Sequence, residues 1–456
     1  MLASDTLGIP LGTGQPPAFL AALGDRDDWV DLRIYGALLL AWSEAFKHPN
    51  VHYLSGFFGP VERSLRDSGA NISFAPADFR RFEPLLEQQA PRVMATVAAP
   101  PDEAGWCSLS LHAGGTLKEL IRAGADPERL LIAEVSPHFP RTAGLPPEHR
   151  HALHLDQIDL LVESEAEPFA LPEAEPSQID EAIARHARRF IPDGATLQTG
   201  IGTIPSAIVG RLAEGDAGGD YGVHSEMFTD GLMRLHEAGK VTNRKGQFDG
   251  VSVATFAGGS PELYAWLDGN DEVAFLPVEV VNSPDLIGRN RMMVTINAAI
   301  AVDIHGQVIA DTIHGGQYSG IGGHEDFIAG PALALEDRAL LCLPSTVSLA
   351  GELRSRIVPW FEAGAVVTTP RHQVDVIVTE HGAAELQGLT VHQRGLALAE
   401  IAHPDFRDGL REAAERASHG RSAVGELRLA AVLRRPPVLR PLLLARARVR
   451  LPPCDE

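Results

Sequence analysis

The chain has 456 residues, of which 45% are hydrophobic and 22% are charged, the balance of a globular protein with a large core. At roughly 150 residues per domain, that length predicts two or three domains, and the composition excludes a disordered or fibrous chain. With 60 Asp and Glu against 39 Lys and Arg, the formal charge is −21, and a surface this acidic repels phosphate backbones, so we expect no nucleic-acid partner.

The cysteines and the apolar runs indicate the compartment. The only thiols are Cys107, Cys342 and Cys454, which are far apart along the chain and therefore exclude a disulfide scaffold. The first residues lack the charged start and the apolar run of a signal peptide. No stretch approaches the roughly 18 apolar residues that a membrane helix needs. We expect a cytoplasmic protein with no membrane partner.

The first elements in chain order are a glycine loop at residues 12–14, an amphipathic helix after it, and buried strands at 130–135 and 157–162. Acidic residues and prolines then alternate through residues 163–176. Proline removes backbone donors and like charges repel, which favours an extended, solvated linker. We therefore place an N-terminal domain at 1–165 and a linker at 166–178.

The second part repeats the alternation of helices and strands. A helix is predicted over 179–190, with Ile179, Ile183, His186 and Phe190 on one face. Strands are predicted at 196–198, 251–256, 294–297 and 374–379. Such alternation indicates an α/β architecture with mainly parallel sheets. We place this domain at 179–416, followed by an Arg-rich tail at 417–456. We interpret the tail as a segment that packs over an acidic body rather than as a membrane-surface or partner-binding segment.

An internal repeat connects the two parts. Residues 12–20 and 200–208 both read G-x-G-x-x-P followed by an amphipathic helix. Paired glycines allow a tight turn, and a proline near the start of a helix loses no useful hydrogen bond. Two copies of one α/β domain explain the match, although a pattern this short also arises by chance.

Three segments contain candidate site residues. Two are glycine loops, at 200–204 and 315–323, and glycine permits close approach of a ligand. The third, at 222–231, contains His224, Glu226 and Asp230 between glycines. An ionised glutamate is a competent nucleophile toward a thioester, but on composition alone a solvated charge is the commoner role of a glutamate.

Other candidates are weaker. His149, His151 and His154 favour a solvated loop over a metal site, so no metal is predicted. Cys107 is expected to pack as a small hydrophobe. The G-x-S-x-G pattern of many serine hydrolases is absent.

Together the segments resemble the acetyl-CoA hydrolase/transferase family, of the 4-hydroxybutyrate and butyrate:acetate CoA-transferase type. The resemblance runs from about Gly12 to Phe406, and six segments in one order make it specific. These segments are 197–205, 222–231, 318–327, 364–371, 378–388 and 401–406.

The resemblance implies two similar open α/β domains with mainly parallel sheets and the active site between them. It implies that Glu226 is the nucleophile, ionised at neutral pH. It also implies a set of residues near coenzyme A or a developing oxyanion: Gly200, Ile201, Gly202, Thr203, Ile204, Asn297, Gly320, Gly322, Gly323 and Ser345. We add Arg289, Arg291 and Arg371 as candidates for the phosphates of coenzyme A, against ordinary surface roles.

The implied activity is exchange of coenzyme A between a short-chain acyl-CoA and a free carboxylic acid such as acetate, butyrate or 4-hydroxybutyrate, through a glutamyl-CoA thioester. Coenzyme A is then a substrate, with no tightly bound cofactor, and the resemblance implies a homodimer or higher homo-oligomer. An acyl-CoA hydrolase using the same glutamate stays open as an alternative, and a catalytically degraded CoA-binding protein is a remoter one.

Two departures from the family pattern are visible. The chain begins about ten residues before the first glycine loop, so the first strand and helix are expected to be missing or incomplete. After the second glycine loop, the family's Gln-Val-Asp-Phe and later Arg are replaced by His324, Glu325 and Ala329, which we expect to alter acid specificity or CoA affinity.

Overall fold

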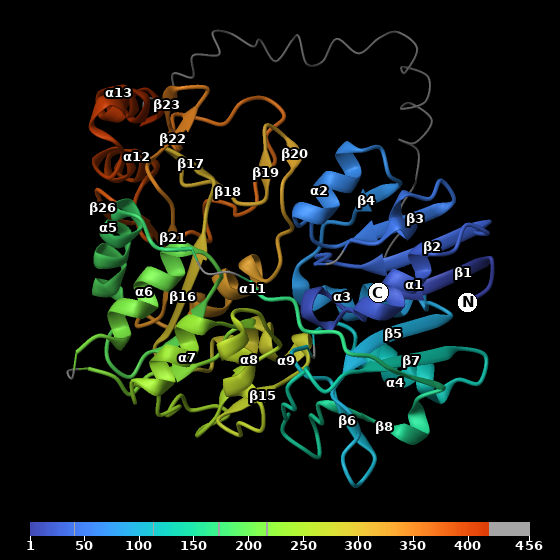
Figure 1. Ribbon diagram of the computed structural model, residues 1–456. Coiled ribbons are helices and arrows are strands. Elements are labelled where there is room, and N and C mark those ends of the chain that lie inside the picture. Colours follow the sequence, from blue (N-terminus) through green and yellow to red (C-terminus); the bar gives the residue numbers. More distant parts are fainter. Residues whose placement is uncertain (41, 113, 172–173, 216–217, 419–456) are drawn as a thin grey trace, which may run out of the picture.

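Two sheets, each flanked by helices, divide the chain into two lobes. The computed structural model describes residues 1–40, 42–112, 114–171, 174–215 and 218–418. The lobe of residues 1–163 is blue to cyan in Figure 1, and the lobe that follows runs from green to red beside it. The domain boundaries predicted from the sequence remain predictions. Residues 419–456 of the predicted tail lie outside the described residues.

All strand pairs of the first sheet are parallel, in the order β4-β3-β2-β1-β5-β7-β9. The strands are β1 Ser4–Gly8, β2 Asp31–Gly36, β3 Val51–Ser55, β4 Ile72–Phe74, β5 Val93–Ala98, β7 Leu130–Val135 and β9 Leu160–Glu163. The helices are α1 Pro17–Gly24, α2 Pro60–Asp67, α3 Phe82–Gln89 and α4 Leu117–Ala125. All six residues of β5 are buried, as expected of a parallel sheet covered on both faces.

The expectation of a missing first strand is wrong. β1 lies inside the sheet and pairs with both β2 and β5. Leu7 and Ile9 at its end are at most 1% exposed. The few residues before the first glycine loop therefore suffice to build a complete internal strand.

The second sheet has the order β11-β10-β16-β21-β25-β26 and is parallel except between β25 and β26. Its strands are β10 Thr196–Thr199, β11 Gly222–Val223, β16 Met293–Ala298, β21 Arg338–Cys342, β25 Val376–Thr379 and β26 Gly382–Glu385. The helices of this lobe are α5 Gln178–Ala187, α6 Thr203–Ala213, α7 Asp230–Glu237, α8 Pro261–Leu267, α9 Val278–Val281, α10 Pro284–Ile287, α11 His324–Ala329, α12 Val391–Glu400 and α13 Arg407–Ser418.

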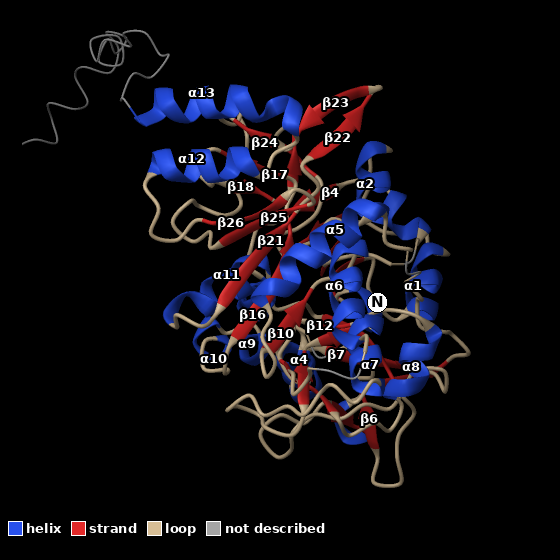
Figure 2. Cartoon of the chain, turned by 90° about the vertical axis from the view of Figure 1, so that its left-hand side faces the viewer, coloured by secondary structure: helices blue, strands red, loops and turns tan. Residues whose placement is uncertain are grey.

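Helices cover both faces of this sheet (Figure 2). Leu340 packs in one core with residues of α5 and α6, whereas its neighbour Leu341 packs in the core of α12 and α13. Successive side chains of a strand point to opposite faces, so one short apolar strand contributes to two cores.

Short strands complete the fold. They pair as β6 Trp106–Ser108 with β8 Ala152–His154, β12 Met227–Phe228 with β14 Phe256–Ala257, and β13 Ser252–Ala254 with β15 Val273–Phe275. A three-stranded sheet is formed by β17 Ala301–Asp303, β18 Val308–Ile309 and β24 Ile357–Val358. Two hairpins pair β19 Thr312–Ile313 with β20 Gly316–Gln317 and β22 Thr346–Leu349 with β23 Glu352–Ser355.

The predicted repeat has a counterpart in the topology. The order β2-β1-β5-β7-β9 in the first sheet matches β11-β10-β16-β21-β25 in the second. In each lobe a strand, β1 or β10, leads through the G-x-G turn into a helix, α1 or α6. The strand that follows this helix in the chain, β2 or β11, then pairs with the first strand. The α/β fold with two similar, mainly parallel sheets is thus confirmed.

The predicted buried face of the helix over 179–190 is partly wrong. α5 ends at Ala187 and continues as a 3-10 turn to Phe190. Ile179 is 42% exposed, and the buried residues are Asp180, Ile183, Ala184 and Ala187. Asp180 is drawn inward because its carboxylate caps the helix through Ser177.

The described linker residues before α5, 166–171 and 174–177, form no helix or strand, but the segment is not simply solvated. The backbone N–H of Leu171 donates to Gly259 O at 2.8 Å, and the hydroxyl of Tyr264 donates to Phe169 O at 2.7 Å. The segment therefore lies against the second lobe through these two backbone groups, whereas the Phe169 side chain is 46% exposed.

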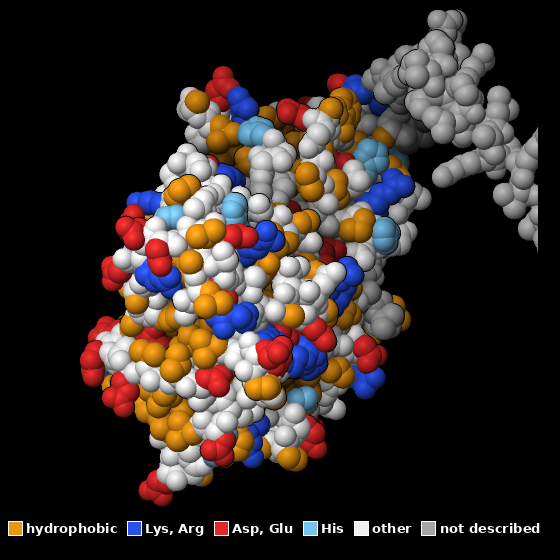
Figure 3. Space-filling view, turned by 90° about the vertical axis from the view of Figure 1, so that its right-hand side faces the viewer, with side chains coloured by type: hydrophobic (Ala, Val, Ile, Leu, Met, Phe, Trp, Pro, Cys, Tyr) orange, Lys and Arg blue, Asp and Glu red, His pale blue; other side chains and the backbone are white. Residues whose placement is uncertain are grey.

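On the face of the first lobe in Figure 3, acidic, basic and hydrophobic side chains are interspersed. Exposed apolar side chains of this lobe include Leu160, Leu161 and Val162 of the edge strand β9. None of the described helices is long and apolar enough to span a membrane.

Candidate active site

A cavity of about 560 Å³ lies between the lobes, where the central strands of the second sheet end. The first lobe contributes mostly apolar residues, Leu11, Leu38, Leu40, Phe57, Phe79 and Phe82 among them. The second lobe contributes most of the predicted site residues, namely Gly200, Ile201, Glu226, Asn297, Gly320, Gly322 and Gly323. The carboxyl ends of parallel strands are the usual place for a ligand in α/β proteins.

The backbone on both sides of Glu226 is anchored to neighbouring strands. The Ser225 hydroxyl donates to Met227 O at 2.9 Å and accepts from the N–H of Thr199, at the end of β10, at 3.3 Å. The carbonyl of Glu226 accepts the N–H of Thr255 at 2.9 Å. With its backbone held in this way, the Glu226 side chain is presented to the cavity.

Among the described residues, Asn282 is the side chain that hydrogen-bonds to the Glu226 carboxyl. Asn282, which directly follows α9, donates from Nδ2 to Oε2 of Glu226 at 2.6 Å and to Oδ2 of Asp326 at 3.0 Å. Burial raises the pKa of Glu226 to about 8, Asp326 adds to the rise, and the Asn282 amide and the N–H of Gly323 oppose it. Burial thus opposes the expected ionisation of Glu226 at neutral pH, whereas the Asn282 amide and the N–H of Gly323 favour it.

An ion pair joins this group to the first lobe. Oδ1 of Asp326, which is completely buried, lies 2.5 Å from a guanidinium nitrogen of Arg80, and the backbone N–H of Arg80 donates to Oδ2 at 3.2 Å. Burial raises the pKa of Asp326 to about 6, and Asn282 and Arg80 oppose that rise. The lobes thus share one polar chain from Glu226 to Arg80.

The second glycine loop packs tightly on both lobes. A Cβ at Gly323 would overlap Oε2 of Glu226, and one at Gly320 would lie 2.6 Å from Cδ2 of Phe57. Gly322, with φ of 57°, accepts the N–H of Phe79 at its carbonyl at 2.9 Å. The loop therefore packs closely on Glu226 and on the first lobe, and its approach to coenzyme A stays a prediction.

The first glycine loop forms part of the rim. Gly200 and Ile201 line the cavity, and Ile201 is 57% exposed. Gly202 has φ of 118°, which L-residues rarely adopt, and it begins α6. Thr203 and Ile204 form the first turn of that helix and do not line the cavity.

Comparison with known proteins decides the family. The family model for the acetyl-CoA hydrolase/transferase C-terminal domain matches residues 259–414. The chain is 35% identical over 404 residues to 4-hydroxybutyrate coenzyme A transferase of Clostridium kluyveri, covering 87% of this chain and 90% of that protein. It is 36% identical to butyryl-CoA:acetate CoA-transferase of Anaerostipes caccae, with coverage of 88% and 90%. The chain belongs to the acetyl-CoA hydrolase/transferase family.

Solved structures agree with this membership. RipA from Yersinia pestis matches with a TM-score of 0.81 and 31% identity, covering 91% of this chain and 95% of RipA. 4-Hydroxybutyrate CoA-transferase from Porphyromonas gingivalis matches with a TM-score of 0.73, 27% identity, and coverage of 91% and 94%. The resemblance found in the sequence is confirmed, and this family member is a CoA-transferase.

Of two further residues predicted to contact coenzyme A, one lines the cavity of this CoA-transferase and the other does not. Asn297, at the end of β16, lines the cavity with its amide 3.4 Å from that of Gln198. Ser345 is completely buried and holds Glu380, its Oγ donating to Oε1 at 2.6 Å and its N–H to Oε2 at 2.8 Å. Because both polar groups of Ser345 are occupied away from the cavity, the geometry does not support its predicted contact with coenzyme A.

The predicted arginines also lie elsewhere. Arg291 lies two residues before β16 and so near the amino edge of the sheet, opposite the cavity. Arg289 is exposed and paired with Asp285 at 2.5 Å, and Arg371 is exposed. The described residues that line the cavity include no Lys or Arg.

Sequence reasoning missed three residues of the site, Asn282, Asp326 and Arg80. Asp326 lies inside the family segment at 318–327 and was thus within reach of a motif argument. Asn282 and Arg80 come from segments with no recognisable motif, and only the packing of the lobes brings them to Glu226.

Of the altered residues after the glycine loop, His324 is buried, and Glu325 and Ala329 are partly buried. Nε2 of His324 lies 3.0 Å from Oγ1 of Thr369, whose hydroxyl also donates to Glu325 at 2.5 Å. Burial lowers the pKa of His324 to about 4 and raises that of Glu325 to about 7. His324 is therefore neutral at pH 7 and adds no positive charge to the cavity that it lines.

Proposed function

We propose that this CoA-transferase moves coenzyme A between a short-chain acyl-CoA and a free carboxylic acid through covalent intermediates on Glu226. The observation that carries the proposal is the Glu226 carboxyl, anchored at its backbone, held by Asn282 and facing the cavity between the lobes. The names of the relatives, which include 4-hydroxybutyrate and butyryl-CoA:acetate transferases, support the class of substrate.

The reaction has two halves, and each half consists of two nucleophilic substitutions at acyl carbons. The ionised Glu226 carboxylate attacks the thioester carbonyl, which gives an acyl-glutamyl anhydride and the CoA thiolate. The thiolate attacks the glutamyl carbonyl, releases the first acid as its carboxylate and leaves a glutamyl-CoA thioester. The second carboxylate attacks that thioester, and the released thiolate then takes up its acyl group and frees Glu226. The thioester energy is retained without ATP.

The residues around Glu226 suit these steps. Oxyanions on the attacked carbonyls need preorganised donors, and the N–H of Gly323 and the Asn282 amide already point at this carboxyl. Loss of one such donor costs on the order of 3 kcal/mol in comparable sites. A pKa of about 8 leaves roughly a tenth of the enzyme with the nucleophile ionised at pH 7.

The cavity walls favour transfer over hydrolysis. Leu38, Leu40, Phe57 and Phe79 form an apolar wall of the same cavity from the first lobe. Once substrates fill the cavity, such walls keep water from the anhydride and from the glutamyl thioester. The mechanism requires no metal and no cofactor beyond coenzyme A itself. From the family resemblance we further propose a cytoplasmic homodimer or higher homo-oligomer, which light scattering after size-exclusion chromatography tests.

The assay for the proposal compares acetyl-CoA with butyrate against acetyl-CoA alone. We expect butyryl-CoA to form only with the acid, and Glu226→Gln, which keeps an acceptor for Asn282, to lower kcat at least 1000-fold. Asp285→Asn, an exposed carboxylate outside the cavity, is the matched control with unchanged rate. CoA release at the same rate without acid would show a hydrolase. Binding of CoA without turnover in either mixture would show a degraded enzyme.

A further inference from the structure

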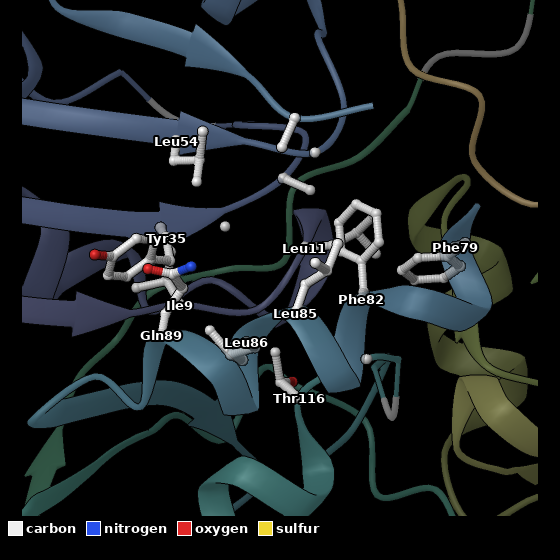
Figure 4. A pocket seen from close by; sticks show the side chains of 15 residues that line it. Ile9, Leu11, Tyr35, Leu54, Phe79, Phe82, Leu85, Leu86, Gln89 and Thr116 are labelled. Atoms are coloured by element: carbon white, nitrogen blue, oxygen red, sulfur yellow. The ribbon is translucent and has the colours of Figure 1, made fainter. Parts of the chain in front are cut away.

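A second, smaller cavity lies in the first lobe, between α3 and the ends of β1, β2 and β3 (Figure 4). Its volume is about 100 Å³, and its walls are almost wholly apolar, with Ile9, Leu11, Leu54, Leu85, Leu86 and Phe82 among them. Tyr35 and Gln89 lie at the end away from Phe79. An apolar cavity of about 150 Å³ binds benzene, which has six carbons, so a cavity of about 100 Å³ has room for a few carbons at the end of a hydrocarbon chain.

The small cavity begins where the active-site cavity ends. Leu11, Phe79 and Phe82 line both, and the rings of Phe79 and Phe82 meet edge to face with centroids 5.1 Å apart. These side chains are thus the shared wall between the small cavity and the space in front of Glu226.

The backbone makes room for that wall at two glycines. A Cβ at Gly56 would overlap the Phe82 ring, and one at Gly115 would lie 2.7 Å from Cβ of Phe82. The Phe82 side chain is itself partly exposed rather than sealed in a core. Its ring therefore lies against the backbone of Gly56 and beside the Phe79 ring, at the boundary of the two cavities.

The charges of the active-site cavity favour an apolar substrate tail. Among the described residues that line it, the ionisable side chains are Glu226 and His324, and His324 is neutral at pH 7. A second carboxylate on the substrate would find no cation among these residues. It would lose its hydration without gaining an ion pair, which costs binding free energy. Each buried methylene, in contrast, gains free energy by leaving water.

We propose that the small cavity is an acyl-tail subsite, which selects apolar monocarboxylic acids longer than butyrate over dicarboxylic acids. The inference rests on the proposed function. Only if the carboxyl of the substrate acid reacts at Glu226 does the hydrocarbon tail of that acid extend past Phe82 into the small cavity. Leu54, Ala75 and Leu85 then set the length of chain that fits.

The test is an acceptor series of butyrate, hexanoate and succinate with acetyl-CoA as the donor. In the unmodified enzyme we expect kcat/KM to rise about fourfold per methylene from butyrate to hexanoate and to be at least tenfold lower for succinate than for butyrate. Succinate as good as butyrate, or hexanoate no better than butyrate, would overturn the subsite. Absence of transfer to every acid would instead overturn the proposed function.

Variants that fill the small cavity separate this subsite from general hydrophobic preference. Ala75→Leu, from the strand side, and Leu85→Phe, from the partly exposed face of α3, both take space from the cavity. Each is expected to lower the hexanoate-to-butyrate ratio of kcat/KM about tenfold. Ala104→Leu, an exposed position outside both cavities, is the matched control. An unchanged ratio in either folded cavity variant would contradict the assignment.

Discussion

Protonation of a single side chain, Glu226, is expected to control the pH dependence of the rate. Because its pKa lies near 8 and only the carboxylate attacks, kcat/KM should rise with pH and level off above about 8. Asp326→Asn removes a negative charge that raises this pKa and leaves the Arg80 cation in place. The pH profile of this variant should shift to lower pH by roughly 0.5–1 unit.

The profile distinguishes electrostatics from folding. Asp285→Asn also removes one carboxylate, but from an exposed pair with Arg289, and its profile should match that of the unmodified enzyme. A shift of the Asp326→Asn profile to higher pH, with unchanged melting temperature, would show that the charge coupling has the wrong sign.

Gly323 offers a steric prediction at the same carboxyl. An alanine there places its Cβ against Oε2 of Glu226 and Nδ2 of Asn282, so Gly323→Ala should lower kcat at least 100-fold by displacing the nucleophile. Gly210→Ala is the matched control, because that glycine lies inside α6 with open space around its Cβ position. It should retain activity and gain about 0.5–1 kcal/mol of stability. Equal activity of both variants, measured by acid-dependent transfer, would contradict the geometry.

At the scale of elements, the start of α2 shapes one wall of the active-site cavity. The buried Glu62 carboxyl accepts the N–H of Leu39 at 2.6 Å and that of Gly59 at 2.9 Å. Leu38, which lines the cavity, has φ of 45°. The helix thus holds a loop in a conformation that its own residues disfavour.

Glu62→Ala should therefore affect stability and binding together. Two buried N–H groups lose their acceptor, which costs about 2–3 kcal/mol, and the KM for the acid should rise as the loop relaxes. Thermal melting and steady-state kinetics check both. Glu87→Ala, on the exposed side of α3, is the control. A stable variant with unchanged KM would show that the loop holds its shape without Glu62.

Apolar runs predicted the elements well where burial is two-sided. The strands expected at 130–135 and 294–297 appear as β7 and β16 with bounds within one residue. The run at 251–256 divides into β13 and β14, which pair in different small sheets. The face of α5 is predicted only in part because Ile183 is its one large apolar buried residue, and the other buried residues are Asp180, Ala184 and Ala187.

At the scale of the whole molecule, the lobe interface completes the site. Motif reading found Glu226 and both glycine loops because each lies in one continuous segment. It could not find Arg80 or Asn282, whose positions depend on how two distant sheets pack. For the same reason it placed Arg291 and Ser345 at the ligand: the sequence does not say which edge of a sheet faces the other lobe, or which hydroxyl is already occupied.

The most direct measurement is the mass of the enzyme after brief incubation with acetyl-CoA, followed by peptide mapping. We expect an adduct with the mass of coenzyme A less one water on the peptide that contains Glu226. The adduct should vanish on addition of a carboxylic acid and be absent in Glu226→Gln. An enzyme that turns over with no adduct, or with the adduct on another residue, would contradict covalent catalysis by Glu226.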